Sequence, residues 1–336
     1  MGTDRAPSER AKPWVWLGLI FAAMLLFHGI GESDISDFLV IAPKPFDLTA
    51  PLERQFLYSS PLNYFLAWAL NLATPLGFYL IHGLEILGML AVILICLRKK
   101  FPSADDQIRF LALLSLTPLW LVTLKWIGKP DPILISLLFL SWAYPGNWRL
   151  LFSLIMVMAH REMGTFMCIF LFVCEEGWDY RLLMPLPLGY AFHHYYQHVL
   201  MDHVPGSRLE NWSADIWKHP KQLLARPVIY LLSAFSWLSI ILIEQKPAMR
   251  LGLALAAAFG IAGVCEDFTR DFILLALAPI LLYLETVVKT PKANELMKFL
   301  PLGLLQFQIA YNGIIFKPNN IWLDMLTGHL GRQLIR

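Results

Sequence analysis

Acidic and basic side chains occur together at four breaks between long apolar segments of this chain. These groups lie in the loop around 202–225; at Lys125, Lys129 and Asp131; at His160, Arg161 and Glu162; and at Asp267, Arg270 and Asp271. A further break carries the acids Glu32, Asp34 and Asp37 alone. Arginine binds phosphate oxygens through two parallel hydrogen bonds, and lysine binds them as a point charge. A neighbouring carboxylate can take a proton from an attacking hydroxyl group. The mixture therefore indicates phosphate or pyrophosphate chemistry, and it also suits transport of an organic anion.

Transmembrane helices are the elements that must position these groups. Hydrophobic residues make up 57% of the 336 residues and charged residues 15%, and the formal net charge of +2 gives no indication of nucleic-acid binding. Segments of about 17 to 25 mainly apolar residues, enough to cross roughly 30 Å of hydrocarbon, recur between short polar breaks. We predict an all-α transmembrane bundle of about 10 to 11 spans, forming a single domain over residues 1–336. The predicted spans are 14–30, 76–97, 108–124, 130–144, 149–160, 163–175, 183–201, 226–244, 249–265, 272–288 and 298–316.

Residues 31–75 form the predicted first outer loop. Within it, 61–73 is apolar but too short to span and is cut off by Pro75 and Gly77, so we expect a helix lying on the membrane surface. With a cytoplasmic N-terminus, this count places Arg98–Lys100 and the later basic breaks inside, as the positive-inside rule requires. Counting 61–73 as a span would turn Arg98–Lys100 outward. With 61–73 on the surface, all four mixed groups share the outer face.

Four mixed groups on one face favour a common polar site. Ionisable side chains at membrane depth are costly unless they face a cavity or a partner. The alternative is that each group reaches water separately, as long charged side chains near helix ends do. That alternative explains any single group well, but the repetition at successive helix ends favours a shared site.

The order of motifs in the first half adds a family resemblance. The acids Glu32 and Asp34 follow the first span, Pro61-Leu62-Asn63-Tyr64 opens the next helix, Asp131-Pro132-Ile133-Leu134 opens a later span, and Arg161-Glu162 ends a short apolar hairpin. In this order, residues 14–175 resemble the polytopic GT-C glycosyltransferases, which take sugars from polyprenyl-phosphate carriers. Two features depart from that pattern. The acids are not adjacent, and the second helical half, 176–336, lacks the large soluble domain that many such enzymes carry.

The resemblance implies inverting sugar transfer at the outer face of a bacterial cytoplasmic membrane. Its general base would be Asp34, with Glu32 as the alternative. The resemblance assigns phosphate binding to the basic residues at the other outer span ends, namely Lys125, Lys129, His160, Arg161 and Arg270. It assigns supporting roles to the remaining acids: Asp37 and Asp131 would orient these bases, and Glu162, Asp267 and Asp271 would pair with Arg161 and Arg270. The implied partners are membrane lipid and a polyprenyl-phosphate-linked sugar.

A histidine-rich segment raises a metal hypothesis. On a helix, His194, His198 and Asp202 follow one another by one turn, so the three could ligate one metal ion. No other histidine-rich segment supplies further ligands, and a His/Tyr stripe near a helix end is also typical of an interfacial aromatic belt or a hydrogen-bonded core. A phosphate or sugar contact is a further alternative. We therefore predict no metal site here and leave the cofactor open, with a divalent cation as the candidate.

Two other functions stay open at this point. A transporter or flippase for a polyprenyl-linked or organic anion would show two related halves with broken helices near mid-membrane. A metal-dependent membrane enzyme centred on His194 and His198 is the third possibility. The four cysteines, Cys96, Cys168, Cys174 and Cys265, lie in or beside apolar segments without metal-ligand spacing, so we expect them to pack in the core.

Overall fold

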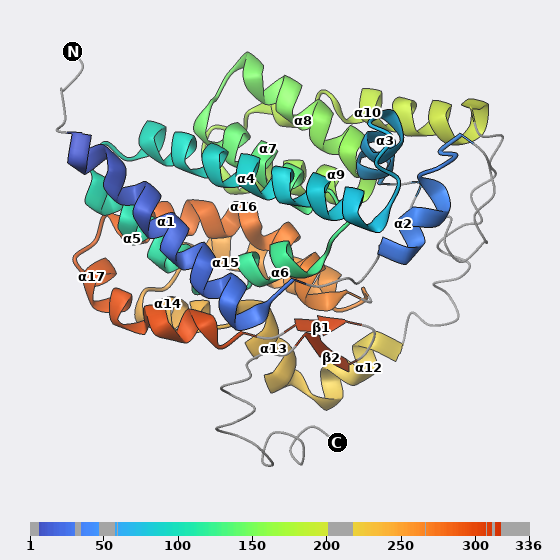
Figure 1. Cartoon of the computed structure of the whole chain (residues 1–336). Helices are drawn as coiled ribbons and strands as arrows, with labels where there is room; N and C mark the ends of the chain where they lie inside the picture. Colours follow the sequence, from blue (N-terminus) through green and yellow to red (C-terminus); the bar gives the residue numbers. More distant parts are fainter. Residues whose placement is uncertain are drawn as a thin grey trace.

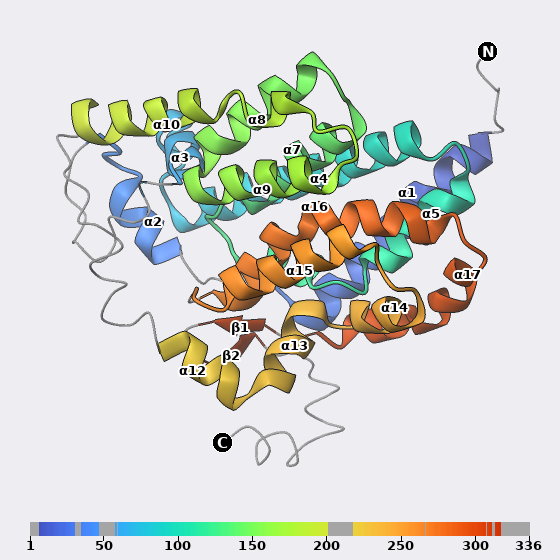
Figure 2. The ribbon, with the colours of Figure 1, turned by 180° about the vertical axis from the view of Figure 1, so that it is seen from behind.

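The chain folds into a bundle built around one long buried helix, α16 (Phe268–Val288), in a computed structural model (Figure 1). The structure describes residues 7–30, 35–46, 58, 60–200, 218–265, 267–306, 308–310 and 313–316. Helix α16 is apolar on all sides apart from its two ends, and such a helix must be covered all round. It packs against α9 (Arg161–Cys174) and α15 (Met249–Ala262), which lie beside it in Figure 2.

The remaining elements form the layers around α16. The first half contributes α1 (Pro7–His28), α2 (Ile35–Ile41), α3 (Leu62–Ala69), α4 (Pro75–Lys100), α5 (Ala104–Leu114), α6 (Leu119–Lys125), α7 (Asp131–Ala143) and α8 (Asn147–Ala159). The second half contributes η2 (Tyr180–Leu182), α10 (Leu186–His194), the π-helix η3 (Tyr195–Leu200), α12 (Lys218–Ala225), α13 (Pro227–Phe235), α14 (Leu238–Glu244), α17 (Lys292–Leu296), the 3-10 helix η4 (Met297–Leu304), β1 (Gln308–Ala310) and β2 (Gly313–Phe316). The predicted all-α class is confirmed, and the two short antiparallel strands are the sheet in the described part of the chain.

The number of helices that can cross a membrane is smaller than the sequence count. By length and composition, three helices qualify among the described residues: Ala11–His28, Pro75–Lys100 and Phe268–Val288. Two bent pairs raise the count to five if each pair is one span; α5 and α6 meet at 65°, and α13 and α14 meet at 91°. The predicted spans 130–144, 149–160 and 249–265 are helices of 13 to 14 residues, shorter than the roughly 20 residues that a perpendicular span needs.

The last predicted span, 298–316, was wrong. Residues 297–304 form the 3-10 helix η4, and residues 308–310 and 313–316 form the two strands. Pro301 lacks a backbone N–H and so cannot continue an α-helical hydrogen-bond ladder. The β-branched Ile309, Ile314 and Ile315 favour an extended backbone after it. An apolar run alone does not distinguish this arrangement from a helix.

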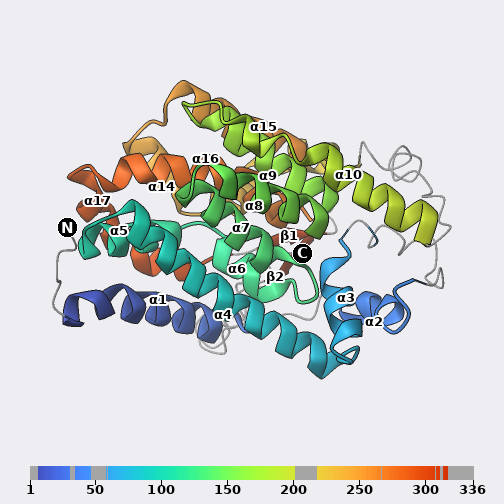
Figure 3. The same cartoon turned by 90° about the horizontal axis from the view of Figure 1, so that it is seen from above.

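The predicted short helix in the first long link is present. It is α3, which packs on α4 together with α2, and Figure 3 shows the three at the end of the bundle where α4 begins. The turn between α3 and α4 is tight because Gly77 lies against the carbonyl of Leu72; a Cβ at Gly77 would stand 2.0 Å from that oxygen. The position of α3 on a membrane surface stays a prediction.

The helices give the bundle two distinct ends. At one end, which we call the site end, α1, α6 and α8 finish and α7, α9 and α16 begin; Lys125, Asp131, Arg161 and Arg270 lie there. At the other end, which we call the network end, α4, α7, α9 and α16 finish and α8 and α15 begin. The groups at Lys125–Asp131, His160–Glu162 and Asp267–Asp271 all belong to the site end.

Candidate functional site

The centre of the site end is a buried ion pair between Asp131 and Arg270. Arg270 Nε and Nη2 each donate to one oxygen of Asp131 at 2.6 Å, and the side chains are 0% and 4% exposed for Asp131 and Arg270. Arg270 Nη1 also donates to Asp271 at 3.2 Å, and the charge of Asp267 acts on the same guanidinium. The bidentate geometry holds the first turn of α7 against the first turn of α16. Three of the acids assigned supporting roles thus surround Arg270.

The chemical consequence concerns the role of Arg270. Its Nε and Nη2 are committed to Asp131 and its Nη1 to Asp271, so few of its five N–H donors point elsewhere. The geometry therefore supports Arg270 as a residue that positions Asp131 and the start of α16. Two hypotheses follow from the sequence here: that Arg270 binds phosphate directly, and that Asp131 orients a basic residue. This arrangement supports the second more than the first.

Strand β1 and the α6–α7 link close over this pair. The Trp126 indole N–H donates to Gln308 Oε1 at 2.8 Å, and the backbone N–H of Ile309 donates to Thr269 Oγ1 at 2.8 Å. The Arg270 guanidinium lies over the Trp126 ring, 5.7 Å from its centroid. Aromatic and strand contacts thus shield the ion pair from solvent, and a shielded pair is held more strongly than an exposed one.

Two buried lysines precede Asp131 in the chain: Lys125 ends α6, and Lys129 lies in the link between α6 and α7. Lys125 Nζ donates to the backbone carbonyl of His28 at the end of α1, and the Lys125 side chain is buried. The Lys129 ammonium lies 5.8 Å from the centroid of Phe38 on α2, and Lys129 is 6% exposed. Both lysines therefore link the end of the bundle to α1 and to the segment that follows the predicted general base.

The third mixed group forms at the junction of α8 and α9. Arg161 donates to Glu162 at 2.6 Å and to Gln197 of η3 at 3.4 Å, while His160 Nδ1 lies 3.6 Å from Glu162. Gln197 is buried, and Arg161 keeps about three tenths of its side chain exposed. The predicted pairing of Glu162 with Arg161 is present in the structure. The partial exposure leaves Arg161 the better placed of the two arginines to meet a ligand.

Several predicted site residues lie outside the described residues. Glu32, Asp34 and Asp202 are among them, and so is the side chain of Asp37, whose backbone belongs to α2. The structure therefore leaves the general-base assignment as a prediction. In the part of the chain that is described, no group of three His, Cys, Asp or Glu side chains is placed to hold a metal ion. The His194 and His198 rings do approach, with centroids 4.5 Å apart, but their third predicted ligand is Asp202.

Sequence reasoning missed a polar group inside the α4 span. Asn63 Nδ2 donates to Glu85 Oε2 at 3.3 Å, His82 Nδ1 lies 3.7 Å from the same oxygen, and His82 Nε2 bonds the Thr123 carbonyl at 2.8 Å. The charge of Asp131 also acts on Glu85. The signal was available, because a histidine and a glutamate inside an apolar span mark a site by default. Their isolation from other charges along the sequence concealed them.

An aromatic cluster connects the first long link to η3. The hydroxyl groups of Tyr64 and Tyr196 lie 3.0 Å apart, and Tyr196 donates to the Pro45 carbonyl at 2.6 Å. Burial, together with the neighbouring Tyr196, raises the pKa of Tyr64 well above its ordinary value, so this hydroxyl group stays neutral. Phe46 and Trp68 pack edge to face at the exposed rim of the same cluster. The histidine-rich helix therefore contributes to a hydrogen-bonded core through Tyr196, as one of the sequence alternatives holds.

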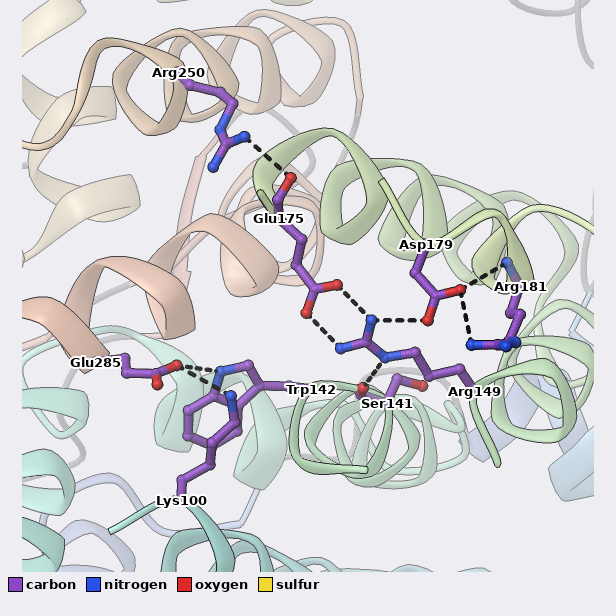
Figure 4. A network of polar contacts seen from close by, with 9 residues as sticks. All are labelled: Lys100, Ser141, Trp142, Arg149, Glu175, Asp179, Arg181, Arg250 and Glu285. Carbon is purple, nitrogen blue, oxygen red and sulfur yellow. Dashed lines mark hydrogen bonds and ion pairs between the residues drawn. The ribbon is translucent and has the colours of Figure 1, made fainter. Parts of the chain in front are cut away.

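The network end carries ion pairs of a different kind (Figure 4). Arg149 donates to both oxygens of Glu175 at 2.5 Å and to Asp179 at 3.1 Å, and Arg250 donates to the Glu175 carbonyl. Separately, Glu285 accepts from Lys100 and from the Trp142 indole, at 3.3 and 2.9 Å. The basic residues that the sequence indicates as topology signals are thus also structural, since they join the ends of neighbouring helices.

No protein-family model, curated protein or solved structure matches this chain. The functional argument is therefore carried by the residues described above.

Proposed function

We propose that this chain is a membrane glycosyltransferase that moves a sugar from a polyprenyl-phosphate carrier to an acceptor at the site end. The observation that carries the proposal is that Lys125, Lys129, Arg161 and the Asp131–Arg270 pair all lie at the site end. Lysine and arginine are the side chains that bind phosphate oxygens, so this end of the bundle has the residue types to hold a phosphate headgroup entering from the lipid. The mixed groups then mark where the carrier phosphate is held.

The proposed chemistry divides the work between two kinds of group. Asp34, with Glu32 as the alternative, takes the proton from the acceptor hydroxyl group as its oxygen attacks the anomeric carbon. The bond from that carbon to the phosphate oxygen breaks, and the configuration at the carbon inverts. Lys129 and Arg161 stabilise the charge that develops on the departing phosphate. Arg270 holds Asp131 and the start of α16 in place, so the site end is already ordered when the charge develops on the phosphate.

The test is sugar transfer by the purified chain in liposomes that contain polyprenyl-phosphate sugars labelled with radioisotope. We expect Asp34→Asn to abolish transfer while carrier binding persists, because the change removes a base without removing volume. Asp105→Asn, at the exposed start of α5 on the network end, is the matched control and should transfer normally. Near-normal turnover by Asp34→Asn would refute the assignment of the base. Absence of transfer by the wild-type chain across a panel of carrier sugars would refute the function.

A transporter or flippase is the second candidate, because the structure contains two broken helix pairs. The α5–α6 pair bends by 65° in the first half and the α13–α14 pair by 91° in the second. Discontinuous helices in both halves are typical of transporter binding sites. Flux of an organic anion or a polyprenyl-linked lipid across liposome membranes, without any sugar transfer, would favour this function over the first.

The proposed orientation places the N-terminus in the cytoplasm of a bacterial cell and the site end outside. Single cysteines at Glu162 and Arg181, in a chain lacking its four native cysteines, test this directly. Glu162 opens α9 at the site end, and Arg181 follows α9 at the network end. An impermeant thiol reagent applied to whole cells should label position 162 and spare position 181. The reverse pattern would place the catalytic chemistry on the cytoplasmic side.

A further inference from the structure

The polar group of Asn63, His82 and Glu85 contains acceptor atoms that the surrounding chain leaves without donors. Asn63 Oδ1, His82 Nδ1 and Glu85 Oε1 are buried, and none receives a hydrogen bond within the described structure. The three residues come from α3 and α4, and their side chains are almost fully buried; those of His82 and Glu85 are 4% and 6% exposed. Buried polar atoms are normally satisfied, and the exceptions call for an explanation.

The tautomer of His82 follows from its partner. The Thr123 carbonyl can only accept, so His82 Nε2 must carry a hydrogen and donate it across the 2.8 Å contact. His82 Nδ1 is then either a bare lone pair or the second N–H of an imidazolium. Since Nδ1 lies 3.7 Å from Glu85 Oε2, a proton on Nδ1 would face the carboxylate. One added proton therefore has two adjacent places to reside.

The charge of the group favours binding of that proton. With neutral His82, an ionised Glu85 leaves one uncompensated negative charge in the interior, and such a charge is strongly unfavourable there. Glu85 is ten residues beyond Pro75, which is about 15 Å along the helix and near the middle of a hydrocarbon core of roughly 30 Å. Among the described residues, Asp131 also acts on Glu85 through its charge, and Asp131 is paired with Arg270.

We propose that His82 and Glu85 form an intramembrane proton-exchange site that binds one proton from the aqueous medium. In one state the N–H of the His82 imidazolium faces an ionised Glu85. In the other state the N–H bond has broken, an O–H bond has formed on Glu85, and both side chains are neutral. Both states hold the bound proton, and its release to the medium leaves neutral His82 beside an ionised Glu85. Asn63 holds the carboxylate in place through its Nδ2 hydrogen bond. The site is independent of the sugar chemistry, because no step of that chemistry uses these residues.

The position of the site suggests what it serves. Thr123, which orients His82, belongs to α6, the second limb of the bent α5–α6 pair, and Lys125 follows it at the site end. Protonation of the pair changes the charge held between α4 and α6. Uptake and release of the proton would therefore bias how α6 sits against α4 and so couple proton binding to events at the site end.

Infrared difference spectroscopy on the full-length chain in liposomes tests the proposal. Between about pH 5 and pH 8, the wild type should show a pH-dependent carbonyl band of a protonated carboxylic acid in an apolar environment. Glu85→Gln should remove this band. The control Glu285→Gln changes a glutamate held by Lys100 and Trp142 at the network end, and it should leave the band intact. Loss of the band in both variants, or in neither, would overturn the assignment.

His82→Gln separates the proposed pair from an isolated buried acid. This variant retains a donor for the Thr123 carbonyl but cannot take the exchanged proton, so the midpoint of the band should move by about one pH unit or more. An unchanged midpoint would remove His82 from the site. Asn63→Ala keeps both proton-binding side chains and removes a hydrogen bond to Glu85, so it should shift the frequency of the band. This variant provides a second test if Glu85→Gln fails to fold. A band that responds to sodium and not to pH would show a cation site and refute proton exchange.

Discussion

Removing the carboxylate of Asp131 should destabilise the bundle more than any exposed charge change. In Asp131→Asn the volume is kept, but the negative charge is lost and one of the two oxygens that accept from Arg270 at 2.6 Å becomes an NH2 group facing an N–H donor, in a site that is almost fully buried. Hydrogen bonds to charged groups contribute about 1.5–3 kcal/mol each, and breaking a buried pair costs about 3–5 kcal/mol. The contact of Arg270 with Asp271 at 3.2 Å offsets part of the loss. We therefore expect a decrease of about 3–4 kcal/mol in the free energy of unfolding.

The assay is reversible unfolding in mixed micelles, followed by tryptophan fluorescence. Asp106→Asn is the matched control, because Asp106 pairs with Arg109 at 2.8 Å while both side chains stay partly exposed. That variant should lose at most about 1 kcal/mol. Replacing both Asp131 and Arg270 by apolar residues should recover about 2 kcal/mol relative to Asp131→Asn, since the guanidinium left without Asp131 is then gone, although Asp271 also loses its contact with Arg270. A loss below about 1 kcal/mol in Asp131→Asn would refute the reasoning, because it would mean that the pair is solvated.

Three further predictions concern packing and the two ends of the bundle. Arg149→Gln should lower the free energy of unfolding by about 3 kcal/mol or more, because its carboxylate partners are left buried. Arg181→Gln changes a half-exposed side chain and should be near neutral. Equal effects of the two variants in thermal unfolding would contradict a structural role for the Arg149 ion pairs. Gly164→Ala places a Cβ 2.2 Å from a backbone oxygen of α8 and should lower the free energy of unfolding by about 1–3 kcal/mol. Gly88→Ala meets open space and should be neutral or slightly stabilising. Similar stabilities of the two variants would refute the close α8–α9 contact. Trp126→Phe removes the donor to β1 and should raise hydrogen exchange of that strand by about five- to tenfold, with unchanged exchange as the contrary outcome.

The bends in the helices show where sequence reasoning reaches its limit. The break between α5 and α6 has a local cause, because Pro118 interrupts the helical hydrogen bonds. The sharper break between α13 and α14 occurs at Ser236, whose φ of 46° is unusual for a residue other than glycine. No proline or glycine marks that position, so surrounding contacts must impose it. The predicted span 226–244 had no local signal against it.

The sequence by itself determined that this chain is an apolar helical protein and that its charges gather at the helix ends. Both features follow from hydrophobic length and from the cost of burying charge, which depend on residue order alone. Only the tertiary structure decided that Arg270 is paired with Asp131, that 298–316 is not a span, and that His82 and Glu85 meet Asn63. Pairings between residues as far apart as 131 and 270 depend on how helices pack, and local composition carries no record of that. The predicted base Asp34 remains the assignment that the proposed transfer assay decides.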